Sequence, residues 1–210
     1  MMQFGRGKKS IEANNRGSYI DGPLVYLLNT RGSDSYTLFE SDCISAGRIA
    51  RYRVRDDKAC SIAAIAACIY ANRQEITGEL ASYDDIYAHC LGAACEKRLY
   101  TDVRGTPPFY IDNAARRALK NYGSDWSAKN RYFSPLRFGM EEIPEGRPLI
   151  INIAFGYYAR HSLTVVGYRR YKNSSGRVYN FFEVKDGWEP NLPRYVFVPS
   201  LMIAGVTIIY

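Results

Sequence analysis

The sequence predicts an α+β protein, with helices in the first half of the chain and an antiparallel sheet in the second half. Apolar residues recur at intervals of three and four between residues 60 and 123, which is the helical period. After Pro148 the chain runs in short segments rich in branched and aromatic residues, a pattern typical of strands. Because the two patterns are segregated along the chain, a sheet covered by helices is favoured over alternating βαβ units.

The chain has 210 residues, enough for one sizeable domain. We expect this domain to span residues 19–210, with a helical part near 56–125 and a β part near 148–210. Residues 1–18 are polar and are expected to form a flexible tail, without the apolar segment of a signal peptide. No segment approaches the run of about 18 apolar residues that spans a membrane. These features favour a cytoplasmic protein, unless the chain is a fragment of a larger secreted one.

Charge and cysteine content narrow the partners and the compartment. The formal net charge is +7, which favours an anionic partner or surface. The basic residues are scattered and form no dense block, so no specific nucleic-acid binding is expected. The chain has five cysteines, an odd number without an export signal, and these are expected to be reduced thiols. Nothing in the sequence indicates the oligomeric state.

Two strands are expected before the first helix. They are "PLVYLLNT" at residues 23–30 and "RIARYRV" at residues 48–54, with a loop of glycine, serine and aspartate near residues 32–35.

Three helices follow. The first covers residues 60–73, in which isoleucines and alanines share one face. The second is capped by Ser82 or Asp84 and has an apolar face between Tyr83 and Ala94. The third lies within residues 106–123 and ends with Gly123 at its C-cap position.

The β part is expected to contain five strands. A turn of sequence "NSSG" at residues 173–176 joins two of them into a hairpin. The strands cover residues 149–155, 162–168, 178–185, 194–198 and 205–210.

The chain has two histidines, and His161 occupies the more promising position for catalysis. It begins a strand, where an imidazole can be held rigidly; a structural histidine is the alternative. If the chain turns at residues 173–176, Asp186 ends the neighbouring strand at the same edge of the sheet and can hold one ring nitrogen. Trp188 can shield that hydrogen bond from water. The alternative is that Asp186 and Gly187 are plain turn residues.

Cys60 begins the first predicted helix. Unpaired N–H groups and the helix dipole favour a thiolate at this position, and the N–H of Cys60 can donate to a developing oxyanion. The alternative is a buried structural cysteine, which is the interpretation we give to Cys68 further along the same helix. The order of Cys60, His161 and Asp186 matches a nucleophile, a base and the group that orients the base.

The segments around these residues resemble papain-like cysteine peptidases, in the style of bacterial bacteriocin-leader peptidases and of staphopain and streptopain. The resemblance covers about residues 55–200. It is carried by "ACSIAAIAACIY", "RHSLTVVGYRRY" and "YNFFEVKDGWEPNLPRYVFVP", with "ALKNYG" and "EEIPEGRPLIINI" between them. It implies a papain-like fold and hydrolysis of peptide bonds in a peptide or protein substrate. Cys60 would be the nucleophile, His161 the base and then the acid, and Asp186 the orienting residue.

One departure from the family lies just before the cysteine. Papain-like enzymes carry a glutamine there, whose side chain completes the oxyanion hole, whereas "RYRVRDDKAC" contains neither glutamine nor asparagine. Arg53 or Tyr52 is the candidate replacement, and loss of one such donor typically costs about 3 kcal/mol. The basic residues 51–55 and the acidic residues 83–87 either line a cleft or are solvated faces. The other substrate-cleft candidates are Gly156, Tyr157, Tyr158 and Trp188.

Three alternatives remain open. Amidases, transglutaminases and N-acyltransferases share the order Cys–His–Asp, so transfer of an acyl group is possible chemistry for the same residues. A non-catalytic papain-like domain that binds peptides fits the missing glutamine. A zinc site formed by His89, Cys90 and Cys95 is a weaker hypothesis, because the cysteine spacing is loose and the segment is predicted to be helical. We therefore expect neither a metal nor a cofactor.

Overall fold

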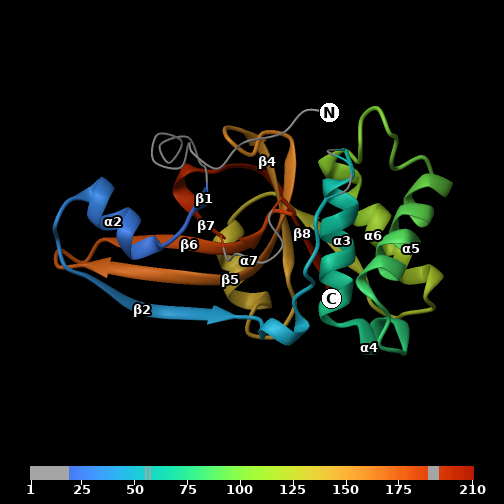
Figure 1. The fold of residues 1–210 in the computed structure, drawn as a ribbon, viewed down its shortest axis with the longest axis horizontal. Helices are drawn as coiled ribbons and strands as arrows, with labels where there is room; N and C mark the ends of the chain where they lie inside the picture. The colour runs from blue at the N-terminus through green and yellow to red at the C-terminus, as the bar shows by residue number, and fades with distance from the viewer. Residues whose placement is uncertain (1–18, 55, 57, 189–193) are drawn as a thin grey trace.

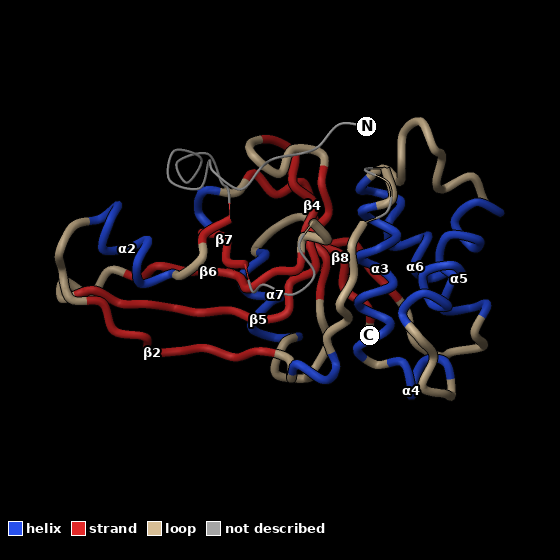
Figure 2. The backbone as a smooth tube through the Cα atoms, in the orientation of Figure 1, coloured by secondary structure: helices blue, strands red, loops and turns tan. Residues whose placement is uncertain are grey.

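The computed structural model describes residues 19–54, 56, 58–188 and 194–210. Helices from the N-terminal half pack on a C-terminal, mostly antiparallel sheet of eight strands, so the predicted α+β class is confirmed (Figure 1). The helices between residues 60 and 121 lie together on one side of the strands, whereas the helices at residues 23–31 and 135–142 lie beside the strands (Figure 2). The proposed tail at residues 1–18 lies outside the described residues.

The three predicted helices are present. They are α3 (Cys60–Ala71), α5 (Tyr83–Glu96) and α6 (Ile111–Asn121). The Ser82 hydroxyl caps α5 by accepting a hydrogen bond from the Asp85 N–H at 3.2 Å. Gly123 follows α6 with a φ of +70°, a left-handed conformation that glycine adopts without strain. The first helix was predicted to end at residue 73. In the structure α3 ends at Ala71, and the short helix α4 (Arg73–Thr77) begins two residues later.

Helix α3 is central to the molecule, because it contacts α5, α6 and the strands β4 (Leu149–Phe155) and β5 (His161–Asn173). All of its residues except Tyr70 are buried. Its many alanines allow this close approach on every side, since a small side chain keeps the helix axis near its neighbours. The first residue of α3 is therefore fixed against the sheet.

The sheet has the strand order β1-β7-β6-β5-β4-β8-β3, and β2 (Tyr36–Cys43) pairs with β5 beside this path. The five predicted strands are confirmed. The first half of β5 pairs with β4, whereas its second half pairs with β2. The remaining strands are β1 (Tyr19–Ile20), β3 (Ala128–Arg131), β6 (Val178–Lys185), β7 (Arg194–Phe197) and β8 (Met202–Ile209).

The two faces of the sheet bury different parts of the core. On β4, Ile150 packs with the helices, whereas Leu149 and Ile151 pack in a second cluster on the other face. Residues of α7 (Pro135–Glu142) cover that second cluster. The alternation follows from the period of two along a strand, so Asn152, like Ile150, is expected on the helical side.

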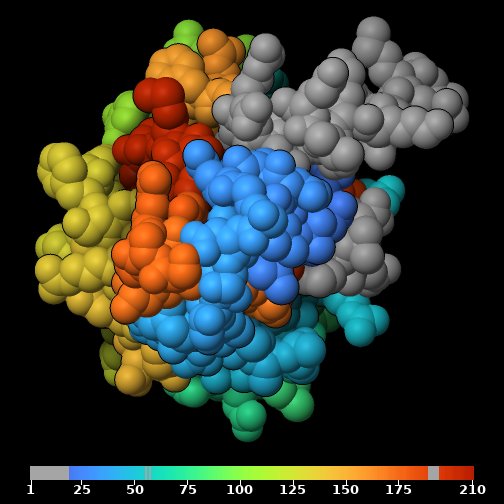
Figure 3. All heavy atoms as spheres, turned by 90° about the vertical axis from the view of Figure 1, so that its left-hand side faces the viewer, coloured from blue at the N-terminus to red at the C-terminus, as the bar shows by residue number. Residues whose placement is uncertain are grey.

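The predicted strand at residues 23–30 is wrong, because this segment forms the helix α2 (Pro23–Arg31). Proline is well tolerated in the first turn of a helix, and Pro23, Tyr26 and Leu27 are buried at helical spacing. Tyr26 and Leu27 pack on residues of β5, β6 and β7, at the end of the molecule that faces the viewer in Figure 3. The loop expected near residues 32–35 is present and leads into β2.

The predicted strand at residues 48–54 is also wrong. Residues 51–54 belong to no helix or strand, and the Val54 N–H donates to the Gly187 carbonyl at 2.7 Å. The strand of this region is instead β2, whose side chains are mostly exposed and therefore lack an apolar alternation. Among the described residues, no helix has the length and apolar character needed to cross a bilayer.

Candidate active site

Cys60 is the first residue of α3 and is 5% exposed. The N-cap residue is Ala59, which has no side-chain oxygen with which to satisfy the N–H groups of the first turn. These groups and the helix dipole create a partial positive charge beside the Cys60 sulfur. The helix end therefore favours a thiolate at this position.

His161 begins β5, and its ring and the Cys60 thiol each shift the pKa of the other group. Burial raises the pKa of the thiol, but the hydrogen bond and charge of His161, helped by the Ser162 N–H and the Ser61 hydroxyl, lower the thiol pKa overall. Burial lowers the pKa of His161, but its contacts with Cys60 and Asp186 raise that pKa overall. Both shifts favour a thiolate paired with an imidazolium.

Asp186 also reaches the site, but through a different atom from the one expected. The Nε2–H of His161 donates to the main-chain carbonyl of Asp186 at 2.7 Å, which leaves Nδ1 as the ring nitrogen for Cys60. The Asp186 carboxylate instead accepts hydrogen bonds from the Trp188 N–H at 2.9 Å and the Tyr158 hydroxyl at 3.1 Å. The orienting group is therefore a carbonyl, and the carboxylate holds the surrounding chain.

The charge of Asp186 is balanced by Arg194, the first residue of β7. The guanidinium lies 2.5 Å from the carboxylate, and the two side chains are 13% and 0% exposed. Removing water from a carboxylate is costly unless a cation and further donors replace the water. Here the cation is Arg194, and the further donors are the Tyr158 hydroxyl and the Trp188 N–H. Sequence reasoning gave Arg194 no role, because the residue lies on another strand and its contact with Asp186 depends on how the two strands are arranged.

Trp188 covers the histidine. Its ring stacks on His161 with centroids 4.8 Å apart and on Tyr158 with centroids 5.0 Å apart. This position agrees with the expectation that Trp188 shields the hydrogen bond between His161 and Asp186 from water.

The four cleft candidates do not all line an accessible surface. Gly156 is exposed, and Tyr157 and Trp188 are half-buried with their rings 5.7 Å apart. Tyr158 is 0% exposed, so the expectation that it forms a substrate wall is wrong. Its ring fills the space beneath Trp188, and its hydroxyl holds Asp186.

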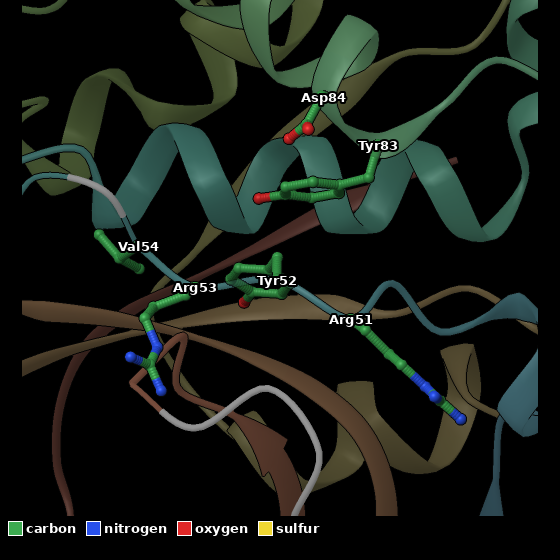
Figure 4. A pocket seen from close by; sticks show the side chains of 6 residues that line it. All are labelled: Arg51, Tyr52, Arg53, Val54, Tyr83 and Asp84. Carbon is green, nitrogen blue, oxygen red and sulfur yellow. The ribbon is translucent and has the colours of Figure 1, made fainter.

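The two candidate oxyanion donors have other surroundings. The Tyr52 hydroxyl contacts the Thr164 hydroxyl at 3.0 Å and donates to the Lys185 carbonyl at 3.4 Å. Burial raises the pKa of this phenol strongly, and its ring stacks on Tyr83. Arg53 is exposed, and its side chain extends away from α3 (Figure 4). The backbone N–H groups at the start of α3 are thus the best placed oxyanion donors.

A pocket of about 520 Å³ lies between the chain preceding α3 and the start of α5 (Figure 4). Residues from the basic and the acidic segments noted in the sequence line it together, so both segments contribute to one cavity. The lining residues are Arg51, Tyr52, Arg53, Val54, Tyr83 and Asp84.

Sequence reasoning also missed a buried polar chain beside the cysteine. The hydroxyls of Ser61 and Ser162 are 2.9 Å apart, and the Ser162 hydroxyl donates to Asn152 Oδ1 at 2.7 Å. A signal for these residues was available. Each serine directly follows a candidate catalytic residue, and Asn152 is the polar residue in the apolar strand "LIINIAF".

The remaining cysteines have the features of structural residues or surface thiols. Cys68 and Cys90 are buried; burial raises the pKa of Cys68 strongly and that of Cys90 to about 12. His89 stacks on Tyr122, and its Nε2 lies 3.1 Å from the Ala118 carbonyl. Within the described part of the chain, no group of histidine, cysteine or acidic residues could hold a metal ion, so the zinc hypothesis has no geometric support.

Comparison with known proteins supplies no further assignment. A scan against models of protein families finds no match to this chain, and neither does a search of curated proteins.

Proposed function

We propose that this protein is a papain-like thiol hydrolase that cleaves peptide bonds, with Cys60 as nucleophile and His161 as base and then acid. One observation carries the proposal. Cys60 is the first residue of a buried helix, and Cys60 and His161 shift each other's pKa toward the charged pair. A cysteine paired with a histidine in this way is typical of enzymes that form a covalent acyl intermediate.

The residues would act in a fixed order. The Cys60 thiolate attacks the carbonyl carbon of the peptide, and negative charge develops on the carbonyl oxygen. The N–H groups of the first turn of α3 stabilise that oxyanion. The His161 imidazolium then gives its proton to the leaving amine, which leaves an acyl group on the sulfur. His161 next takes a proton from water, and the resulting hydroxide releases the acid and restores the thiolate.

Asp186 serves this cycle through its main chain. Its carbonyl accepts the Nε2–H of His161 and so fixes the ring and its tautomer. Trp188 excludes water from this hydrogen bond. Arg194 and Tyr158 hold the Asp186 side chain, which keeps the carbonyl in place.

The test is cleavage of a peptide mixture, followed by mass spectrometry of the products. We expect products with the wild-type protein and with Cys68→Ala, and none with Cys60→Ala. Cys68→Ala is the matched control, because it removes a buried cysteine of the same helix. Cleavage that persists in Cys60→Ala would contradict the proposal. Adding an amine acceptor such as glycine methyl ester distinguishes acyl transfer, which yields an amide product, from hydrolysis, which yields an acid.

A non-catalytic peptide-binding domain is the second candidate. It is favoured by the surroundings of Tyr52, whose hydroxyl contacts Thr164 and Lys185. Under this proposal the pKa of the Cys60 thiol would be about 8.5, the ordinary value for cysteine. A lower midpoint favours the hydrolase.

A further inference from the structure

The strongest unexplained feature is the polar chain formed by Ser61, Ser162 and Asn152. These residues are 3%, 6% and 2% exposed, so each is effectively cut off from bulk water. Asn152 and Ser162 lie directly opposite one another on β4 and β5. At the other end of this polar chain, Ser61 directly follows Cys60 in α3, and its hydroxyl is one of the groups that lower the pKa of the Cys60 thiol. The chain therefore connects the amide of Asn152 to Cys60.

The amide nitrogen of Asn152 is the one atom of this polar chain that is buried without a hydrogen-bond partner in the described part of the structure. Asn152 Nδ2 is buried and has no hydrogen-bond partner among the described residues, whereas Oδ1 accepts a hydrogen bond from the Ser162 hydroxyl. Buried polar atoms without a partner are rare and call for an explanation. Rotating the planar side-chain amide by 180° exchanges the positions of Oδ1 and Nδ2, which have nearly the same shape. The nitrogen then faces Ser162 and donates to it.

The direction of the amide decides what reaches the sulfur, since each serine hydroxyl carries a single hydrogen. When Oδ1 faces Ser162, Ser162 donates to Asn152 and Ser61 donates to Ser162, so Ser61 can only accept from a neutral thiol. When Nδ2 faces Ser162, Ser162 donates to Ser61 and Ser61 donates to the sulfur. The second direction stabilises a thiolate, because an ionised acceptor forms the stronger hydrogen bond.

We infer that Asn152 is a positioning residue, which directs the hydroxyls of Ser162 and Ser61 toward the Cys60 thiolate. This inference rests on the proposed thiolate nucleophile and adds a support for it that comes from the sheet. Three groups then lower the pKa of the Cys60 thiol: His161, the Ser162 N–H and the Ser61 hydroxyl. Asn152 itself remains two residues away from the sulfur and contacts it only through the serines.

The test measures the pH midpoint of Cys60 alkylation by iodoacetamide in a double-mutant cycle. Ser61→Ala should raise the midpoint by about 1–2 units, the effect of losing a hydrogen bond to a charged group. Asn152→Leu should raise it by about 0.3 unit, because the remaining hydroxyls lose the donor that polarises them. The double variant should match Ser61→Ala alone, because Asn152 acts through Ser61. Thr207→Val is the control: it removes a buried hydroxyl of the same sheet that bonds Asn130.

A second measurement covers the case in which Asn152→Leu does not fold. In the wild-type protein, the side-chain amide protons of Asn152 should titrate by NMR with the same midpoint as Cys60 alkylation. Those of Asn130, whose Nδ2 donates to Asp112 and whose Oδ1 accepts from Thr207, should not. An Asn152 amide that ignores this titration, or an Asn152→Leu shift that persists in Ser61→Ala, overturns the inference. Neither readout needs a substrate, so failure of peptide cleavage would be distinguishable from failure here.

Discussion

Replacing Asp186 by asparagine separates the two roles that the structure gives to this residue. The carboxylate pairs with Arg194, whereas the main-chain carbonyl holds His161. Asp186→Asn removes the negative charge and keeps the carbonyl. We therefore expect a less stable protein in which the reactivity of Cys60 is largely kept.

The magnitude follows from the burial of the ion pair. Breaking a buried pair by removing one partner costs about 3–5 kcal/mol. We expect the lower end, about 3 kcal/mol, because asparagine still accepts a hydrogen bond and because the Arg194 side chain is 13% exposed. For a chain of this size, that loss corresponds to a fall in Tm of about 6–12 °C. The midpoint of Cys60 alkylation should rise by less than about 0.5 unit, because the carbonyl still holds the histidine ring.

The assay combines thermal unfolding with the pH dependence of Cys60 alkylation. Arg194→Met should lower the Tm to a similar extent, because it breaks the same pair from the other side. Glu141→Gln is the control for an exposed pair, with side chains 74% and 47% exposed for Arg137 and Glu141, and should cost less than about 1 kcal/mol. If folded Asp186→Asn loses the lowered midpoint entirely, the carboxylate rather than the carbonyl positions His161, and our reasoning is refuted.

Three further predictions concern the surroundings of the site. Gly187→Ala should destabilise the protein well beyond Gly123→Ala: both glycines have a positive φ, +72° and +70°, but only at Gly187 would the new Cβ meet the side chains of Val54 and Tyr52, as thermal unfolding would show. Tyr52→Phe should lower the free energy of unfolding by about 1–3 kcal/mol with kcat unchanged, since the lost hydroxyl bonds Thr164; a large fall in kcat would instead identify it as an oxyanion donor. The pH–rate profile should be bell-shaped. The midpoint of its rising limb should lie below about 8.5, because the pKa of the Cys60 thiol is lowered, and the midpoint of its falling limb above about 6.5, because the pKa of His161 is raised. In His161→Asn, the midpoint of Cys60 alkylation should move up toward about 8.5.

The sequence predicts those elements well whose burial leaves a clear period. Helix α3 and the strands β4, β5 and β6 are examples, because their residues face a core on one side or on all sides. Strand β2 was missed because it is an exposed strand, stabilised by pairing with β5 rather than by an apolar face. Helix α2 was mistaken for a strand because its apolar residues include three exposed ones, Leu24, Val25 and Leu28, which hide the buried helical stripe.

For the candidate site, the sequence predicts which residues meet but not which atoms do. The hairpin brings His161 and Asp186 to one edge of the sheet, as the spacing of the strands indicates. Whether the carboxylate or the carbonyl faces the ring depends on Arg194, Tyr158 and the turn at Gly187, which lie on separate segments. The role of Asn152 depends in the same way on a contact between strands. Such contacts need the register of the sheet, which composition and periodicity do not supply.

The most direct test of the central claim is the rate of alkylation of each cysteine at pH 6.5, measured by quantitative mass spectrometry with iodoacetamide. We predict that Cys60 reacts faster than the exposed Cys43 and Cys95, although it is buried, because only Cys60 is paired with a histidine among the described cysteines. His161→Asn should remove this advantage. The claim would be contradicted if Cys60 reacted no faster than Cys68, the buried cysteine of the same helix.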